Sequence, residues 1–249
     1  MWVKERHQRI LSMLAANHQV NANDLAGMLG VSRETVRRDL VDLEEIGKVA
    51  RVHGGAILPE TRSEDPFCQR MASQVRAKTE IAKKAVSLIQ PGYTIMVDAG
   101  STTAVFAREL VKVPGVSVIT NSLDVATTLQ SGGLDVVLLG GRIAADVPAT
   151  VGELTLSEIR RFEVDLCFSA PVALHPAKGS FFYDLQEAEI AIAMAGQAVR
   201  TVVLAHHTKL GATSRVQSWD VDGIGTLVTN RAVPRALLDQ FQNAGIEVV

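Results

Sequence analysis

The chain has 249 residues, of which 47% are hydrophobic and 21% charged, with a formal net charge of -2. These values predict a folded protein with a sizeable core, and they exclude both a disordered chain and a globally basic nucleic-acid binder. Because the sequence shows no signal-peptide core, no long apolar run and no metal or disulfide spacing around Cys68 and Cys167, we expect a cytoplasmic protein without metal or other cofactor.

Two short helices are predicted at the start of the chain. Ile10 and Leu14 recur at helical spacing in the first. Asn21 is a suitable N-cap for the second, and Gly30 is suited to end it as a left-handed cap residue. Both helices have an apolar face, so we expect them to pack on a shared core.

A third helix is predicted from the stretch VSRETVRRDL at residues 31–40. Ser32 is a suitable N-cap, and Val36 and Leu40 share one apolar face. Arg37 and Arg38 fall on the flank and the opposite face, which leaves them exposed. The short Gly30–Ser32 connection is typical of a helix-turn-helix, in which the second helix enters the major groove of DNA.

A small β-hairpin is predicted after the third helix. Apolar and basic residues alternate over 50–53, Gly54 and Gly55 make the turn, and residues 56–58 return. We therefore predict a winged helix-turn-helix over residues 1–58, mostly α with a small β wing. The predicted DNA contacts are Ser32, Arg33, Thr35, Arg37, Arg38, Arg51 and His53.

A solvated helix face with no partner is the alternative explanation for these arginines. On that interpretation Arg38 merely pairs with Asp42, one turn further along the helix. The combination of two preceding helices and a basic hairpin favours DNA binding.

The run ERHQRIL…VNANDLAGMLGVSRETVRRDLVDLEEIGKVARVHGGAIL resembles the N-terminal domain of DeoR-type bacterial transcriptional regulators. The elements that match are R-x-x-x-I-L, VS-x-x-TVRRDL and R-x-HGGA. The resemblance implies a winged helix-turn-helix that usually represses operons for carbohydrate use.

A linker is predicted over residues 59–76. Residues 59–66, PETRSEDP, are polar and bracketed by prolines, which is typical of a hinge. A helix is expected to start at about Pro66 with Asp65 as its cap. The apolar period resumes at Ile81 and stops before Pro91.

Residues 77–249 alternate between apolar runs and helical stretches, which predicts one larger α/β domain. The runs are short, continuous and rich in β-branched residues, as in strands buried on both faces of a mostly parallel sheet. The predicted strands are TIMV, VSVIT, DVVLLG, DLCFSA, TVVLA, GTLVT and the terminal IEVV.

Polar or glycine-rich segments follow these strands, and in a parallel sheet they meet at one edge, where ligands bind. In the segment DAGSTT, Gly100 allows close approach, Ser101 and Thr102 supply hydroxyls, and the next helix offers unpaired N–H groups to a phosphate. The alternative is that this segment merely caps the helix that follows it and binds no ligand. Asp98 is suited either to accept from sugar hydroxyls or to cap that helix, and Lys209 is suited to add a cationic contact.

The resemblance to DeoR-type regulators continues through D-x-GST, TNSL, the LLGG pair and T-K-LG-x-TSR, which match their sensor domain. That domain resembles ribose-phosphate isomerases in fold and usually binds a phosphorylated sugar or related metabolite. The resemblance implies the effector contacts Asp98, Gly100, Ser101, Thr102, Thr120, Asn121, Gly141 and Lys209.

Two segments depart from the family pattern. His206 replaces the usual aspartate, which predicts altered ligand choice and sensitivity to pH near neutrality, or else merely a hydrogen bond to a neighbouring carbonyl. Residues 169–184 replace a glycine-rich loop.

The sequence therefore predicts a DNA-binding repressor without enzymatic activity, a homodimer or tetramer that an anionic effector releases from its operator. The alternative is a sugar-phosphate isomerase with an accessory DNA-binding head, for which Asp98 and Glu187 are possible acid–base groups. The third possibility is an architectural DNA binder without a ligand. The polar segments that follow the predicted strands argue against it, because they indicate a ligand pocket.

Overall fold

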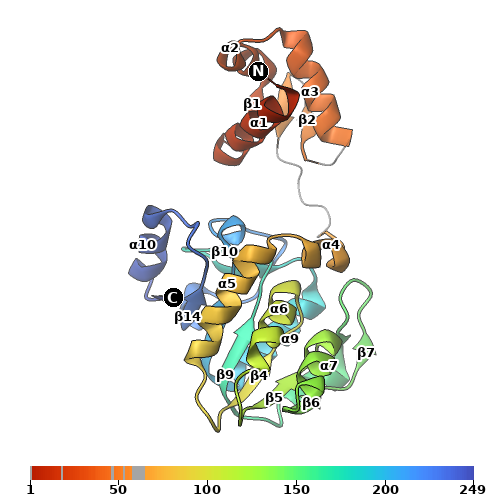
Figure 1. Cartoon of the computed structure of the whole chain (residues 1–249), viewed down its shortest axis with the longest axis vertical. Coiled ribbons are helices and arrows are strands. Elements are labelled where there is room, and N and C mark those ends of the chain that lie inside the picture. Colours follow the sequence, from red (N-terminus) through yellow and green to blue (C-terminus); the bar gives the residue numbers. More distant parts are fainter. Residues whose placement is uncertain (1, 18, 46–47, 53, 58–64) are drawn as a thin grey trace. The chain divides into compact units, whose positions relative to one another are not determined.

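The structure is a computed structural model, and it describes all residues except 1, 18, 46–47, 53 and 58–64 (Figure 1). The chain forms two compact units, Met1–Ser63 and Glu64–Val249. Most of the predicted hinge, 59–66, lies outside the described residues. The second half of the predicted linker contains a helix, as expected from about Pro66, and the start of another, and both belong to the second unit.

The first unit contains three helices and a small sheet among its described residues. In chain order its elements are α1 (Val3–Asn17), β1 (Gln19–Asn21), α2 (Ala22–Leu29), α3 (Arg33–Glu45), β2 (Ala50–Val52) and β3 (Gly55–Ile57). The predicted hairpin is β2–β3, and β1 adds a third strand that the sequence did not indicate, in the order β1-β3-β2.

The predicted caps of α2 and α3 are confirmed. The Asn21 side chain accepts from the Asn23 amide, and Gly30 ends α2 with a φ of 65°. Ser32 Oγ accepts from the Thr35 amide at 3.1 Å, which satisfies a free N–H at the start of α3. These caps fix the tight turn between the two helices.

The core of this unit is formed by the apolar faces of the three helices and the inner face of the sheet. Its buried residues are Ile10, Leu14, Val20, Leu25, Leu29, Val36, Leu40, Leu43, Val49 and Ala56. Gly55 is required by packing, because a Cβ there would lie 2.0 Å from the Val20 carbonyl oxygen. The wing is thus held directly against β1.

The second unit is built on a seven-stranded parallel sheet in the order β15-β14-β12-β9-β4-β5-β6. In chain order the unit contains α4 (Phe67–Ala72), α5 (Val75–Ala85), η1 (Val86–Leu88), β4 (Thr94–Val97), α6 (Ser101–Leu110), β5 (Ser117–Thr120), α7 (Leu123–Ser131), β6 (Asp135–Leu138), β7 (Arg142–Ile143), β8 (Thr150–Val151), α8 (Glu153–Ile159), β9 (Val164–Ser169), β10 (Ala173–His175), β11 (Gly179–Phe182), α9 (Leu185–Gly196), β12 (Ala198–Leu204), η2 (His207–Lys209), β13 (Val216–Gln217), η3 (Val221–Gly223), β14 (Thr226–Val228), α10 (Arg235–Asn243) and β15 (Glu247–Val248). Each of the seven predicted runs contains one strand of this sheet.

Helices cover both faces of the sheet, as the sequence predicts. Ile95 and Val97 of β4 pack with α5, α6 and α7, and Figure 1 shows α5 beside α6 over this face. Met96, between them in β4, packs on the opposite face with residues of α8 and α9. The alternation along β4 explains why its whole apolar run is buried.

Several features differ from the sequence-based expectation. The first helix of this unit begins at Phe67, one residue later than predicted, and Pro66 rather than Asp65 occupies the capping position. Strand β6 lies at the edge of the sheet and is largely exposed. The altered segment 169–184 forms the hairpin β10–β11, which pairs with β13 in a separate antiparallel sheet. Among the described residues, no helix has both the length and the apolar character needed to cross a membrane.

Candidate DNA-binding surface and effector site

The predicted recognition helix, α3, buries its apolar face and exposes its arginines. Val36 and Leu40 are buried, whereas the Arg37 and Arg38 side chains are 60% and 76% exposed. Ser32 and Thr35 lie at the exposed start of the helix, where their hydroxyl oxygens are 2.8 Å apart. The helix therefore presents a polar surface from its amino-terminal turns.

Glu34 holds two of these arginines. Its carboxylate accepts two hydrogen bonds from Arg37, both 2.9 Å long, and lies 3.5 Å from Arg38. The hydrogen bonds from Arg37 lower the pKa of Glu34. The predicted alternative, pairing of Arg38 with Asp42, is replaced by this contact with Glu34. Arg37 thus already has a charged partner on its own helix.

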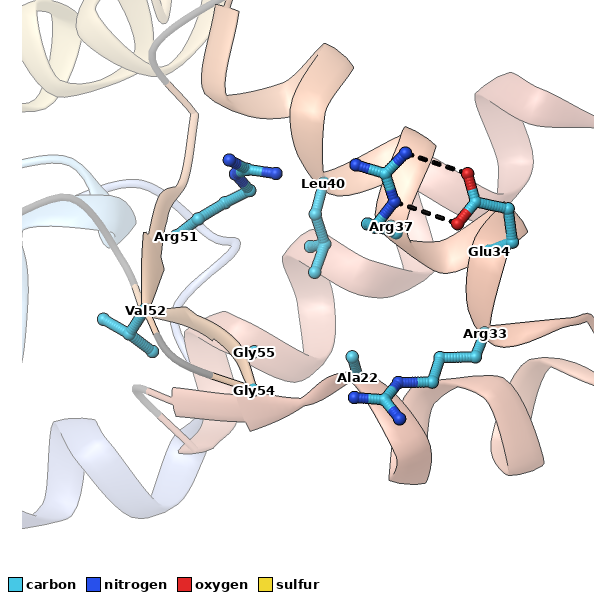
Figure 2. Close-up of a pocket in the computed structure, with 9 residues that line it drawn as sticks. All are labelled: Ala22, Arg33, Glu34, Arg37, Leu40, Arg51, Val52, Gly54 and Gly55. Atoms are coloured by element: carbon cyan, nitrogen blue, oxygen red, sulfur yellow. Dashed lines mark hydrogen bonds and ion pairs between the residues drawn. The ribbon is translucent and has the colours of Figure 1, made fainter.

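A groove of about 730 Å³ separates the recognition helix from the wing (Figure 2). Arg33 and Arg37 line it from α3, and Arg51 lines it from β2. Arg51 also bonds Glu44, with its Nε 2.8 Å from the carboxylate. Three guanidinium groups thus surround one concave surface on a nearly neutral protein. His53, the other predicted wing contact, lies outside the described residues.

A polar cluster lies between α1 and α3. His7, Asp39 and Asp42 bring potential metal-ligand atoms within 4.8 Å of one another. Arg6, however, binds both carboxylate oxygens of Asp39, and this pair is buried. A cation there would meet a fixed positive charge, so we assign the cluster to the packing of α1 on α3.

The predicted effector residues of the second unit lie at the carboxyl edge of its sheet. Strands β4, β5 and β6 follow one another in one direction, whereas β9, β12, β14 and β15 lie on the other side of β4. The strand order therefore reverses between β4 and β9, where parallel α/β sheets bind ligands.

Asp98 lies directly after β4 at this reversal point and is 3% exposed. Its carboxylate bonds the Ser169 hydroxyl at the end of β9 and lies 3.3 Å from the Ala170 amide. Burial raises the pKa of Asp98 to about 7, against the lowering effect of these hydrogen bonds. Asp98 thus joins the two strands and does not cap α6.

The amino end of α6 brings polar groups together without satisfying all of them. Lys78 of α5, 1% exposed, places its Nζ 2.9 Å from Ser101 Oγ. Thr102 Oγ1 and Asn121 Oδ1 are buried and have no hydrogen-bond partner among the described residues. No side chain of the described residues caps α6, so its positive end also faces this edge.

Lys209 and His206 follow β12 on the other side of the reversal point. Lys209 Nζ donates to the Pro171 carbonyl at 2.6 Å, and its charge acts on Asp98. His206 Nδ1 lies 2.8 Å from Thr208 Oγ1. Burial, with Lys209 and Lys78, lowers the pKa of His206 to about 3, so the ring is neutral at neutral pH. The expectation that His206 titrates near neutrality is wrong, and its Nδ1 contacts a hydroxyl rather than a carbonyl.

Two other predicted effector residues have local roles in the fold, whereas Gly100 has none that requires glycine. Thr120 Oγ1 donates to the Val97 carbonyl at 2.6 Å and accepts from the Ser122 amide, which uses its hydroxyl. A Cβ at Gly141 would lie 2.1 Å from Thr155 Oγ1, so packing on α8 requires glycine there. Gly100 has an extended φ of 170° and leaves room for a small side chain.

The sequence itself carries a signal for Lys78. Lys78 lies three, four and seven residues before Ile81, Ala82 and Ala85, three of the buried apolar residues of α5. A lysine at a buried position of an amphipathic helix needs a polar partner inside the protein.

Two family models match this chain. The DeoR-like helix-turn-helix domain matches residues 6–62, and the DeoR C-terminal sensor domain matches residues 73–231. The chain belongs to the DeoR family. This DeoR-family protein is therefore a DNA-binding transcriptional regulator with a C-terminal sensor domain.

Relatives of this DeoR-family protein match along nearly their whole length. The HTH-type transcriptional regulator GolR of Listeria innocua is 32% identical over 100% of this chain and 98% of its own. The HTH-type transcriptional repressor GlcR of Bacillus subtilis is 30% identical, with 100% and 96% covered. The glycerol-3-phosphate regulon repressor of Escherichia coli is 26% identical, with 98% and 97% covered.

Solved structures are similar in fold alone. The eIF2B-beta2-delta2 complex from C. thermophilum aligns over 98% of this chain and 73% of its own, with a TM-score of 0.51 and 14% identity. Ribose 5-phosphate isomerase A from Methanocaldococcus jannaschii aligns over 53% of each chain with a TM-score of 0.40 and 23% identity, a likeness too slight to bear on activity.

Proposed function

We propose that this DeoR-family protein represses an operon for carbohydrate use in the cytoplasm and releases its DNA when a phosphorylated sugar, or a related anionic metabolite, binds the second unit. One observation supports the proposal that an anionic effector binds the second unit. Two buried oxygens, Thr102 Oγ1 and Asn121 Oδ1, have no partner among the described residues, and they share the carboxyl edge with Lys78 and Lys209.

A bound sugar phosphate would satisfy these groups. A buried hydroxyl or amide oxygen without a partner costs free energy, so a ligand that supplies the missing hydrogen bonds binds favourably. Thr102 would donate to a phosphate oxygen at the positive end of α6, and Asn121 Oδ1 would accept from a sugar hydroxyl. Lys78 and Lys209 favour an anion over a neutral sugar.

The family relatives support the same class of effector and regulation. GlcR is a transcriptional repressor, and another relative represses a glycerol-3-phosphate regulon. These are properties of those proteins, and the buried oxygens near Lys78 are the feature of this chain that agrees with them.

For DNA binding we propose that α3 enters the major groove and that the groove between α3 and β2 receives a strand of the DNA backbone. Arg33, Arg37 and Arg51 would then contact phosphates or base edges from both walls of the groove. Because one reading head makes few contacts, we propose a homodimer or tetramer that binds paired half-sites.

The test starts with selection of duplexes from a random DNA library by the full chain. Fluorescence anisotropy then measures the affinity for the selected duplex with ribose 5-phosphate, glucose 6-phosphate, glycerol 3-phosphate and gluconate. We expect at least one phosphorylated compound to weaken binding by about 5- to 150-fold, the usual range of allosteric coupling, and its unphosphorylated parent to have no effect. Failure to select any duplex, or a selected duplex that none of the phosphorylated compounds releases, would contradict the proposal.

The same compounds separate a regulator from an isomerase with a DNA-binding head. NMR spectra of each phosphorylated sugar incubated with the chain should show no conversion. Turnover that is lost in Asp98→Asn or Glu187→Gln would favour the enzyme instead.

A further inference from the structure

Lys78 connects two parts of the second unit through one ammonium group. Its Nζ donates to Ser101 Oγ in the proposed effector site and also to the Arg70 carbonyl in the last turn of α4. The Lys78 side chain is buried, its bond to Ser101 is buried as well, and its bond to the Arg70 carbonyl is partly buried. One charge thus contacts both the amino end of α6 and the last turn of α4, the first helix of the second unit.

The corner between α4 and α5 has an unusual backbone. Gln74, between the two helices, has a φ of 52°, the only positive φ of a non-glycine residue in the described part of the chain. Such a conformation costs free energy, and it persists where surrounding contacts hold it. The Arg70 carbonyl also accepts from the amide and the hydroxyl of Ser73, at 3.2 and 3.1 Å. Lys78 and Ser73 therefore hold this corner through the same oxygen.

An anion at Ser101 would compete for the ammonium of Lys78. A hydrogen bond from an ammonium group to an anionic oxygen is stronger than one to a neutral carbonyl. Ser101 Oγ already lies 2.9 Å from Nζ, so a phosphate oxygen beside Ser101 and Thr102 falls within its reach. When the ammonium turns to the phosphate, the Arg70 carbonyl loses its bond from Lys78.

We propose that Lys78 is the positioning residue that couples the effector site to α4, because its ammonium bonds the Arg70 carbonyl when the site is empty and the effector anion when it is filled. This inference rests on the proposed function. Since α4 is the first helix of the second unit, a change in its position would act on the connection to the DNA-binding unit. The effector changes DNA affinity because the two positions of the ammonium favour different arrangements of that helix.

The test compares Lys78→Met with Lys84→Met in the full chain. Methionine keeps the apolar stem and removes the charge, so the buried site should stay packed. Lys84 lies on the same helix and also donates to a backbone carbonyl, that of Thr229 at 2.8 Å, away from α6. It is therefore a matched control for the loss of one lysine.

Without any effector, we expect Lys78→Met to bind the operator about five-fold or more weakly than the wild type does. Adding the phosphorylated sugar that releases the wild type should change the affinity of Lys78→Met by less than two-fold. Hydrogen exchange of the α4 amides should be faster in Lys78→Met, and also in the wild type with that sugar. Lys84→Met should behave as the wild type. Circular dichroism confirms that each variant is folded, and Lys78→Arg, which keeps the charge, should restore part of the response.

These measurements distinguish a failure of the role assigned to Lys78 from a failure of the proposed function. If the wild type neither binds a selected duplex nor responds to a phosphorylated sugar, the proposed function fails. If the wild type responds, and Lys78→Met has normal operator affinity, normal release and normal exchange of α4, the role assigned to Lys78 is wrong while the function stands.

Discussion

Replacing Thr102 by valine should stabilise the empty protein and weaken effector binding. Thr102 Oγ1 is buried, with the residue 1% exposed, and it has no partner among the described residues. Valine has nearly the same shape without the hydroxyl, so the variant loses an unsatisfied polar group and leaves no cavity. The cost of such a group is about 1–3 kcal/mol, which sets the expected gain in stability at about 1 kcal/mol or more.

The effect on binding should have the opposite sign. If the Thr102 hydroxyl donates to a charged phosphate oxygen, its loss removes a hydrogen bond worth about 1.5–3 kcal/mol, or roughly 10- to 150-fold in affinity. Thr103 provides the matched control, because its Oγ1 donates to the Gly100 carbonyl at 2.9 Å. Thr103→Val should therefore destabilise the protein by about 0.5–1.5 kcal/mol.

The assay is urea unfolding followed by the fluorescence of Trp219, which is buried in the second unit and reports on that unit. Isothermal titration calorimetry with the releasing sugar phosphate gives the affinity. A Thr102→Val variant that is less stable than the wild type, or that binds the sugar phosphate equally well, would refute the reasoning.

Three further predictions concern single positions. Glu34→Gln should raise affinity for the selected duplex by roughly 1.5- to 5-fold at low salt, since it frees Arg37, whereas a loss of affinity in anisotropy would mean that Glu34 itself contacts DNA. Gly55→Ala should unfold the first unit or lower its stability by about 2 kcal/mol or more in thermal denaturation, because the new Cβ meets the Val20 carbonyl; a wild-type melting temperature would contradict this packing. The buried Asp98, whose pKa is about 7, stays protonated in the folded protein at pH values where the unfolded chain is ionised, so unfolding free energy should fall as pH rises from about 4 to 7, by up to about 1.4 kcal/mol per unit. Asp98→Asn should remove that fall in urea titrations, and an unchanged slope would mean that another group causes it.

The architecture could be predicted because its signals are local. Continuous apolar runs such as TIMV mark strands buried on both faces, and the structure buries alternate residues of β4 against helices on opposite sides of the sheet. The caps at Asn21 and Ser32 depend on neighbouring amides, so sequence spacing sufficed. The exposed β6 shows the limit, because an apolar run does not reveal whether its strand is central or at an edge.

The candidate effector site could be predicted only in outline. The sequence predicts that DAGSTT and Lys209 lie at one edge of the sheet, but it does not reveal which side-chain oxygens lack hydrogen-bond partners. Thr120 ends β5 and Thr102 lies in the first turn of α6, and both are buried. Yet the Thr120 hydroxyl bonds the neighbouring strand, whereas the Thr102 hydroxyl has no partner among the described residues. That difference depends on backbone positions in a second strand, which no local pattern encodes.

The pKa of His206 and the burial of Lys78 between two partners could not be predicted from the sequence for a related reason. The expectation for His206 used the ordinary pKa of histidine, whereas burial, the nearby Lys209 and the sequence-distant Lys78 lower that pKa to about 3. Lys78 carried a signal in its helical position, but its two partners lie in different elements on either side of it along the chain.

The most direct test of the account is the affinity for the selected duplex as the releasing sugar phosphate is added, measured for the wild type and for a variant with both Ser101→Ala and Thr102→Ala. The account predicts that the two proteins bind the duplex equally well without the sugar phosphate, and that the wild type alone loses affinity, by about 5- to 150-fold, as it is added. Release of the double variant at the same concentration as the wild type would contradict an effector site at the amino end of α6.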